Sequence, residues 1–207
     1  MAVYRVYVEK KSPFDVEAQG VLSELRSLLG IEGLTGLRLL NRYDVEGLDE
    51  ALMRRCLPVV FSEPQVDIVH TQPMADVCYD EDFPRPAGAH TVLAVEPLPG
   101  QFDQRADSCA ECVQLLSQAE RPAVRTAKVY LLSGSVTPEE LAKIKHYLIN
   151  PVESREASLD TRATLAENYP EPDDVAVLEG FTALDRAGLE ELIARMGLAM
   201  DADDAEF

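Results

Sequence analysis

The strongest constraint on the fold of this chain is an internal repeat. The segment YVEKKSPFDVEA (7–18) matches AVEPLPGQFDQRA (94–106), because each contains Val-Glu, a short proline-containing loop and then Phe-Asp-x-x-Ala. Such a repeat indicates one supersecondary unit that occurs twice and buries a shared core. The matched residues are Glu9 and Glu96, Phe14 and Phe102, and Asp15 and Asp103.

Hydrophobic periodicity predicts the same order of elements in both halves. Alternating apolar residues predict strands, and apolar residues three and four apart predict amphipathic helices. Strands are expected at residues 3–9, 34–45, 65–70, 91–96 and 123–134. Helices are expected at residues 15–29, 48–57, 103–118 and 137–149.

The helix ends carry recognisable signals. Asp15 and Asp103 are predicted N-caps, since a side-chain oxygen at this position accepts a free backbone N–H. Gly30 is predicted to end the first helix. Thr137 and Glu140 fit a capping box, in which side chain and backbone bond reciprocally at the start of a helix.

These elements predict an α+β protein built from two ferredoxin-like halves packed as a pseudo-dimer. The expected N-terminal domain is 1–150, with the repeat at about 2–70 and 91–150 and a polar connector at 74–90. The helices at 15–29 and 103–118 are expected on one side of the joined sheets.

After residue 150 the pattern changes to a polar, proline-containing stretch. A short strand is expected in VAVLEGF (175–181) and an amphipathic helix in DRAGLEELIARMG (185–197), so 151–207 is predicted to be a small, mostly helical linker domain. The chain ends on DADDAEF with no closing element. We therefore expect the sequence to be truncated before a further domain.

Composition excludes several classes of partner. The chain has 207 residues, 46% of them hydrophobic, and a net charge of −18. So acidic a surface repels phosphate backbones and anionic lipid, which argues against nucleic-acid and membrane partners. No apolar run approaches the roughly 18 residues of a membrane span, and the N-terminus lacks a signal-peptide pattern. A cytoplasmic location is expected.

Four cysteines are present, and Cys109 and Cys112 form a C-x-x-C pair. A zinc ribbon needs a second such pair, which the sequence lacks. Both residues lie inside a predicted helix, so they are interpreted as small hydrophobic residues, Cys109 buried and unreactive and Cys112 at most partly exposed. A thiol redox or zinc protein remains an alternative that metal analysis would test.

No motif for nucleotide binding, hydrolase chemistry or metalloprotease activity is present. The three histidines lie in different predicted elements, so they do not suggest a metal or catalytic cluster. Acidic pairs such as Glu139–Glu140 fall in the first turn of a helix, where the helix dipole favours them.

Two polar stretches are denser than a helix cap requires. Arg105 and Arg155 lie within them, and a guanidinium can bind a carboxylate or phosphate in a two-pronged fork. The residues alone leave two interpretations open: a cap with a polar connector, or a docking surface. The candidate interface or substrate-proximal residues are Pro99, Gly100, Gln101, Asp103, Gln104, Arg105, Asp107, Ser108, Asn150, Pro151, Glu153, Ser154, Arg155 and Glu156.

At these stretches the sequence resembles a known family. EPLPGQFDQRADS and YLINPVESREAS are similar to the N-terminal region of phosphoribosylformylglycinamidine synthase of the large single-chain PurL type. Further segments resemble the same region in the same order, among them FDVEAQGVL, NRYDVEG, FSEPQVD, VRTAKVYLLSG and GLAMDADDAEF. The first half also resembles the small separate PurS subunit of split systems.

This resemblance implies a function for the full-length enzyme. The family converts formylglycinamide ribonucleotide, ATP and glutamine into formylglycinamidine ribonucleotide in purine biosynthesis, so ATP and magnesium are implied there. It implies no catalytic residue and no cofactor in this segment, and it implies the synthetase and glutaminase domains of the same enzyme as partners. The alternative is a free-standing ferredoxin-like sensor of a small amino acid or nucleotide.

Overall fold

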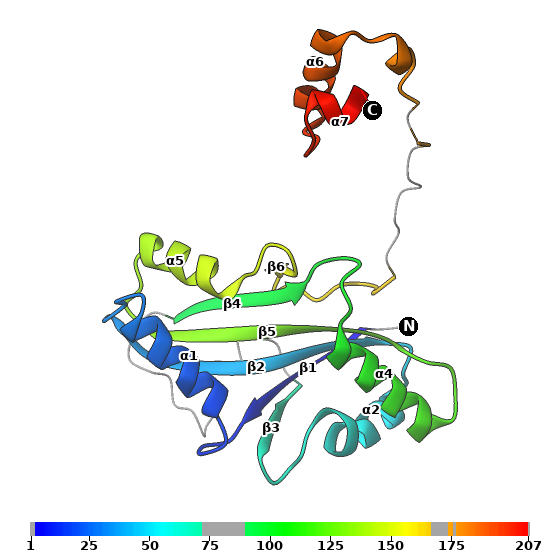
Figure 1. Ribbon diagram of the computed structural model, residues 1–207. Helices are drawn as coiled ribbons and strands as arrows, with labels where there is room; N and C mark the ends of the chain where they lie inside the picture. Colours follow the sequence, from blue (N-terminus) through cyan, green and yellow to red (C-terminus); the bar gives the residue numbers. More distant parts are fainter. Residues whose placement is uncertain (1–2, 72–89, 167–173, 176, 207) are drawn as a thin grey trace. The chain divides into compact units, whose positions relative to one another are not determined.

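The computed structural model describes residues 3–71, 90–166, 174–175 and 177–206. It divides into two compact units, Met1–Glu167 and Asn168–Phe207 (Figure 1). Sequence analysis placed the domain boundary at residue 150, whereas residues 151–166 lie in the first unit.

The first unit is built around one antiparallel sheet. Its strands follow the order β3-β1-β2-β5-β4-β6, and helices connect most of them, so the unit belongs to the α+β class that the sequence predicts. The elements are β1 (Val3–Lys10), α1 (Val16–Ser27), β2 (Leu34–Glu46), α2 (Glu50–Cys56), a short π-helix (Leu57–Phe61), β3 (Asp67–His70), β4 (His90–Pro97), α4 (Gln104–Ser117), β5 (Ala123–Gly134), α5 (Pro138–Leu148) and β6 (Ser154–Glu156).

Strand pairing in the first half recurs in the second. β1 lies between β2 and β3, and β4 lies between β5 and β6, so the strand order is the same from either edge. The register also recurs at one constant spacing along the chain. Val8 pairs with Asn41 and Val69, and Val95 pairs with Lys128 and Glu156.

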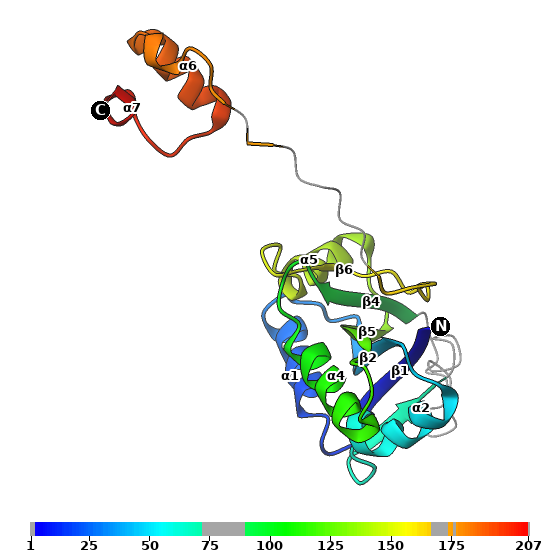
Figure 2. The ribbon, with the colours of Figure 1, turned by 90° about the vertical axis from the view of Figure 1, so that its right-hand side faces the viewer.

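The α-helices that the structure describes in this unit, α1, α2, α4 and α5, lie on one face of the sheet (Figures 1 and 2). Leu39 and Tyr43 of β2 are separated by an even number of residues and therefore point to the same face. Leu39 packs in a cluster with α1 and α5, and Tyr43 packs in a second cluster with α2 and α4. Each cluster combines one helix from each half, so the two halves interlock.

The opposite face of the sheet carries a segment that follows β6, residues 157–165. Arg42 Nη1 donates to the carbonyl of Ser158 at 2.7 Å, and Arg5 Nη2 donates to the carbonyl of Asp160 at 3.0 Å. At the far end, the backbone N–H of Leu165 donates to Glu46 Oε2 at 2.7 Å. These bonds explain why the first unit extends beyond residue 150.

The helix caps match the sequence signals at α4 and α5 but not at α1. Asp103 accepts the N–H of Ala106, and the predicted capping box at Thr137 is present in full. Asp15 makes no capping bond, so its predicted role is wrong. Its backbone lies at ψ 34° and not in the extended conformation of the capping Asp49 and Thr137, and its carboxylate accepts a hydrogen bond from Gln19 Nε2 at 2.8 Å.

The second unit is small and helical in its described part. It contains a 3-10 turn (Phe181–Ala183), α6 (Arg186–Met196) and α7 (Ala202–Glu206). Leu189, Leu192 and Ala202 are buried between the helices. The strand expected at 175–181 is wrong for the described residues, since Gly180 is left-handed at φ 75° and begins the 3-10 turn, which breaks an extended run.

Among the helices that the structure describes, none combines the length and apolar character that a membrane span needs.

Candidate functional site

Pairing of β4 with β6 brings the two polar stretches together. Pro97 lies opposite Ser154 in the register, and the N–H of Leu98 donates to the carbonyl of Glu153 at 2.9 Å. Farther along the loop, Gln101 Nε2 donates to the carbonyl of Val152 at 3.2 Å. Segments that are about fifty residues apart in sequence therefore share one surface.

Asp103 holds this surface against the sheet. Besides the N–H of Ala106 at 2.9 Å, its carboxylate accepts the N–H of Thr126 at 3.0 Å and the hydroxyl of Thr126 at 2.9 Å. The carboxylate of Asp103 thus caps α4. It also binds the backbone N–H of Thr126 in β5, at a point beyond the last residue of β4 that pairs with β5. This role is structural.

An open cavity of about 540 Å³ lies beside the loop. Its volume is within the range of small-molecule sites in proteins. Four candidate residues from both polar stretches line it: Gln101, Arg105, Glu153 and Ser154. Further lining residues come from the strands below and include Asn41, Thr126, Lys128 and Tyr130.

Arg105 projects from the first turn of α4 at the edge of this cavity. Its Nη1 donates a long hydrogen bond of 3.3 Å to the hydroxyl of Tyr43. Among the residues that the structure describes, Arg105 has no carboxylate partner. Its exposed guanidinium is therefore available to an acidic group from outside the chain.

The matching position in the first repeat is paired differently. Glu17 lies two residues after Asp15, just as Arg105 lies two residues after Asp103. Glu17 forms an ion pair with Lys128 at 2.5 Å. Among the described residues, the repeat therefore has an ion pair in one copy and an arginine without a carboxylate partner in the other.

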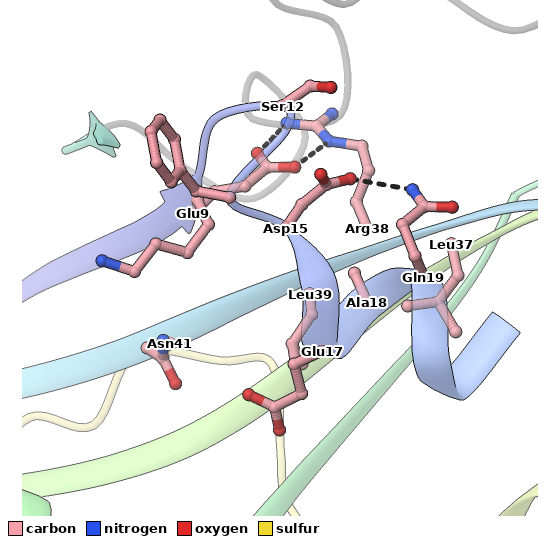
Figure 3. A pocket seen from close by; sticks show the side chains of 12 residues that line it. Glu9, Ser12, Asp15, Glu17, Ala18, Gln19, Leu37, Arg38, Leu39 and Asn41 are labelled. Carbon is pink, nitrogen blue, oxygen red and sulfur yellow. Dashed lines mark hydrogen bonds and ion pairs between the residues drawn. The ribbon is translucent and has the colours of Figure 1, made fainter. Parts of the chain in front are cut away.

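A smaller cavity of about 160 Å³ occupies the equivalent place in the first half. Figure 3 shows its two pairs of joined side chains, Glu9 with Arg38 and Asp15 with Gln19. Arg38 binds both oxygens of Glu9, at 2.8 and 2.6 Å. Burial alone would raise the pKa of Glu9, but the hydrogen bonds from Arg38 and the nearby imidazole of His70, at 3.6 Å, outweigh burial and lower that pKa below its usual range.

The remaining candidate residues lie around the same surface. Asn150 Oδ1 accepts the N–H of Val152 at 3.1 Å, and Glu156 pairs with Lys145 at 2.8 Å. Asp107 forms an exposed ion pair with Arg121. Gln104 and Ser108 border a separate groove along α4, and Pro99, Gly100 and Pro151 form exposed turns.

Two apolar side chains on this surface are exposed. Phe102 is 75% exposed, because α4 begins at Gln104 and Phe102 precedes the cap. Val152 is 71% exposed on the neighbouring turn. An apolar anchor beside an arginine is a combination typical of protein interfaces.

Arg155, for which the sequence left a polar connector and a docking surface open, has a carboxylate partner within the chain. Its Nη2 lies 2.8 Å from Glu96 Oε1, and Glu96 also binds Arg162 at 3.0 Å. Arg155 therefore contributes to an internal ionic network. The sequence repeat identified Glu96 but gave no sign of Arg162.

The C-x-x-C pair has one buried and one exposed thiol. Burial raises the pKa of the Cys109 thiol to about 12, as expected for a residue packed under α4. Cys112 is exposed, as its place on the outer side of the helix requires. Along the helix, Cys112 lies three residues beyond Cys109 and is turned away from the sheet. Cys56 is also a buried free thiol.

We predict that a thiol reagent at neutral pH labels Cys112 rapidly and leaves Cys109 unlabelled in the folded protein. The thiolate is the reactive form, and a high pKa suppresses it. Mass spectrometry of proteolytic fragments after brief labelling checks this result. Cys112→Ser provides the control, since it removes the rapid phase; labelling of Cys109 at the same rate would contradict the prediction.

No protein-family model matches the sequence, and no curated protein matches it either. Within the ranges that the structure describes, no three metal-ligating side chains lie close enough to hold a metal ion.

Proposed function

We propose that this chain is the N-terminal assembly segment of a phosphoribosylformylglycinamidine synthase of the single-chain PurL type. In this proposal the interlocked halves correspond to two PurS-like, ferredoxin-like units joined in one polypeptide. The segment docks the synthetase and glutaminase domains of the same cytoplasmic enzyme and carries no catalytic centre. ATP and magnesium act in those other domains.

One observation carries the proposal: the two sequence stretches most similar to the family form a single surface. The pairing of β4 with β6 places Arg105, Phe102 and Val152 on that surface. An exposed aromatic ring, an exposed aliphatic side chain and an arginine that pairs with no carboxylate in the described ranges suit burial against another protein domain. The recurrent strand order gives independent support for a duplicated PurS-like unit.

Complementation tests the proposal. Chain 1–207 is mixed with the synthetase and glutaminase domains of a single-chain enzyme that lacks its own N-terminal region. We expect glutamine-dependent ATP hydrolysis in the presence of formylglycinamide ribonucleotide only when both parts are present. Arg105→Ala is expected to weaken association at least about thirtyfold, because truncating one partner of a buried charged contact costs about 2–5 kcal/mol.

Arg121→Ala is the matched control, since it removes an exposed ion pair with Asp107 that is worth about 0–1 kcal/mol. Its association should equal that of the unchanged chain. Turnover by chain 1–207 alone would contradict the assignment of catalysis to the other domains. Failure to associate with the other domains would reject the docking role.

The cavity of about 540 Å³ favours a second candidate function, a small-molecule sensor. This function requires binding by the isolated chain. A rise in melting temperature with an amino acid or a nucleotide would support it, and unchanged melting across both ligand classes would leave the assembly role as the better account.

A further inference from the structure

A small arginine-lined cavity lies at the end of β4, behind the loop that follows it. Its lining includes Glu96, Gln101, Arg125, Arg155 and Arg162, and we call it the arginine mouth. In a chain with a net charge of −18, three arginines around one opening are a local exception.

Cations outnumber carboxylates around Glu96. This side chain is buried and binds Arg155 at 2.8 Å and Arg162 at 3.0 Å, while Arg42 approaches it from below at 3.5 Å. Arg42 also pairs with Asp44 at 3.4 Å, and Arg5 holds Asp44 in a fork at 2.5 and 2.8 Å. Four guanidinium groups therefore share two carboxylates in this part of the chain.

Arg155 and Arg162 have N–H donors that Glu96 does not occupy. Arg155 uses Nε and Nη2 on Glu96, and Arg162 uses only Nη2. A guanidinium carries five N–H donors, so each of these side chains has donors beyond those that Glu96 occupies. Their side chains are 45% and 34% exposed, which leaves them accessible from solvent.

The second carboxylate in the mouth does not compete for these donors. Asp103 already accepts hydrogen bonds from the backbone of Ala106 and from both the backbone and the hydroxyl of Thr126. Its oxygens are directed to α4 and β5, so the donors of Arg155 and Arg162 lack a further acid among the described residues.

The size of the mouth restricts the ligand. A volume of about 20 Å³ has room for roughly one water-sized oxygen. An anion can therefore insert one oxygen while its remaining atoms stay at the opening. Phosphate and carboxylate groups both present such oxygens, and an arginine fork matches the geometry of either.

We propose that the arginine mouth binds the terminal phosphate or carboxylate of a small molecule through Arg155 and Arg162. The proposal goes beyond the assembly role and does not rest on it. A ligand of this kind would neutralise the positive charge that remains in excess of Glu96 and Asp44.

Titration of chain 1–207 with inorganic phosphate, and separately with acetate, tests this site at constant ionic strength set by chloride. Line broadening of the phosphorus NMR signal and the melting temperature are the two readouts. We expect both to change saturably with phosphate. Arg162→Gln should weaken phosphate binding about tenfold or more, because it removes a hydrogen bond between two charged groups.

Arg121→Gln is the control, because its guanidinium is exposed but pairs with Asp107 away from the mouth. Arg162→Lys keeps the charge without the fork, so intermediate affinity is expected, and it provides a test if Arg162→Gln is poorly folded. Tighter binding of phosphate than of acetate identifies a phosphate ligand, and the reverse identifies a carboxylate.

Two results would overturn the site: no saturable change with either anion, or equal affinity in Arg162→Gln and the unchanged chain. Neither result bears on the assembly role, which is tested by complementation with Arg105→Ala.

Discussion

Replacing Glu96 with alanine is expected to lower the free energy of unfolding of the chain by about 3–5 kcal/mol, because it leaves buried positive charge uncompensated. Glu96 is 8% exposed and joins Arg155, Arg162 and the almost fully buried Arg42. Arg42 cannot reach water to recover its hydration when Glu96 is absent. Chemical denaturation followed by circular dichroism measures the loss.

Glu153→Ala is the matched control for this change. Glu153 is exposed on the turn beside β6, and its hydrogen bonds to Leu98 and Asn150 use only its backbone, so its substitution should alter stability by less than about 0.5 kcal/mol. A loss of less than about 1 kcal/mol for Glu96→Ala would show that Asp44 compensates Arg42 adequately and that Glu96 is not needed there.

Replacing Ile144 with alanine is expected to cost about 2–5 kcal/mol and to destabilise both halves of the sheet together. Ile144 lies on α5 of the second half, is fully buried, and packs in one cluster with α1 and β2 of the first half. The smaller side chain leaves a cavity and removes contacts that join the first half to the second half. Hydrogen exchange by mass spectrometry, with peptides from β1 and β4, measures the two halves separately.

Leu115→Ala on α4 is the control, since Leu115 is 71% exposed and its removal should leave exchange nearly unchanged. Equal loss of protection in β1 and β4 is expected for Ile144→Ala. Faster exchange in β4 alone would mean that the halves unfold independently and that the shared cluster does not couple them.

The surface formed by the two polar stretches contains residues that have different roles. Asp103 serves the structure, because all its bonds join α4 to β5, whereas Arg105 lacks a carboxylate partner among the described residues. Arg155 belongs to both categories, since it stabilises Glu96 and keeps donors directed to solvent. Substitutions at Arg105 and Arg155 should therefore differ in their effect on stability.

Much of the fold was determined locally by the sequence. Alternating apolar residues specified β1, β2, β4 and β5, because a half-buried strand needs an apolar side chain at every second position. The capping signals at Asp103 and Thr137 marked the starts of α4 and α5 for the same local reason. The repeated Phe-Asp motif indicated that the two halves share an order of elements.

Only the tertiary structure decided which segments meet. The spacing of residues along the chain does not encode that β2 and β5 pair at the centre, that α1 shares a core with α5, or that residues 157–165 cross the sheet. The ionic network at Glu96 depends on the same long-range contacts, since Arg42, Arg155 and Arg162 come from three separate segments. Local propensity acts over a few residues, whereas burial of charge and apolar surface is satisfied only when distant segments pack together.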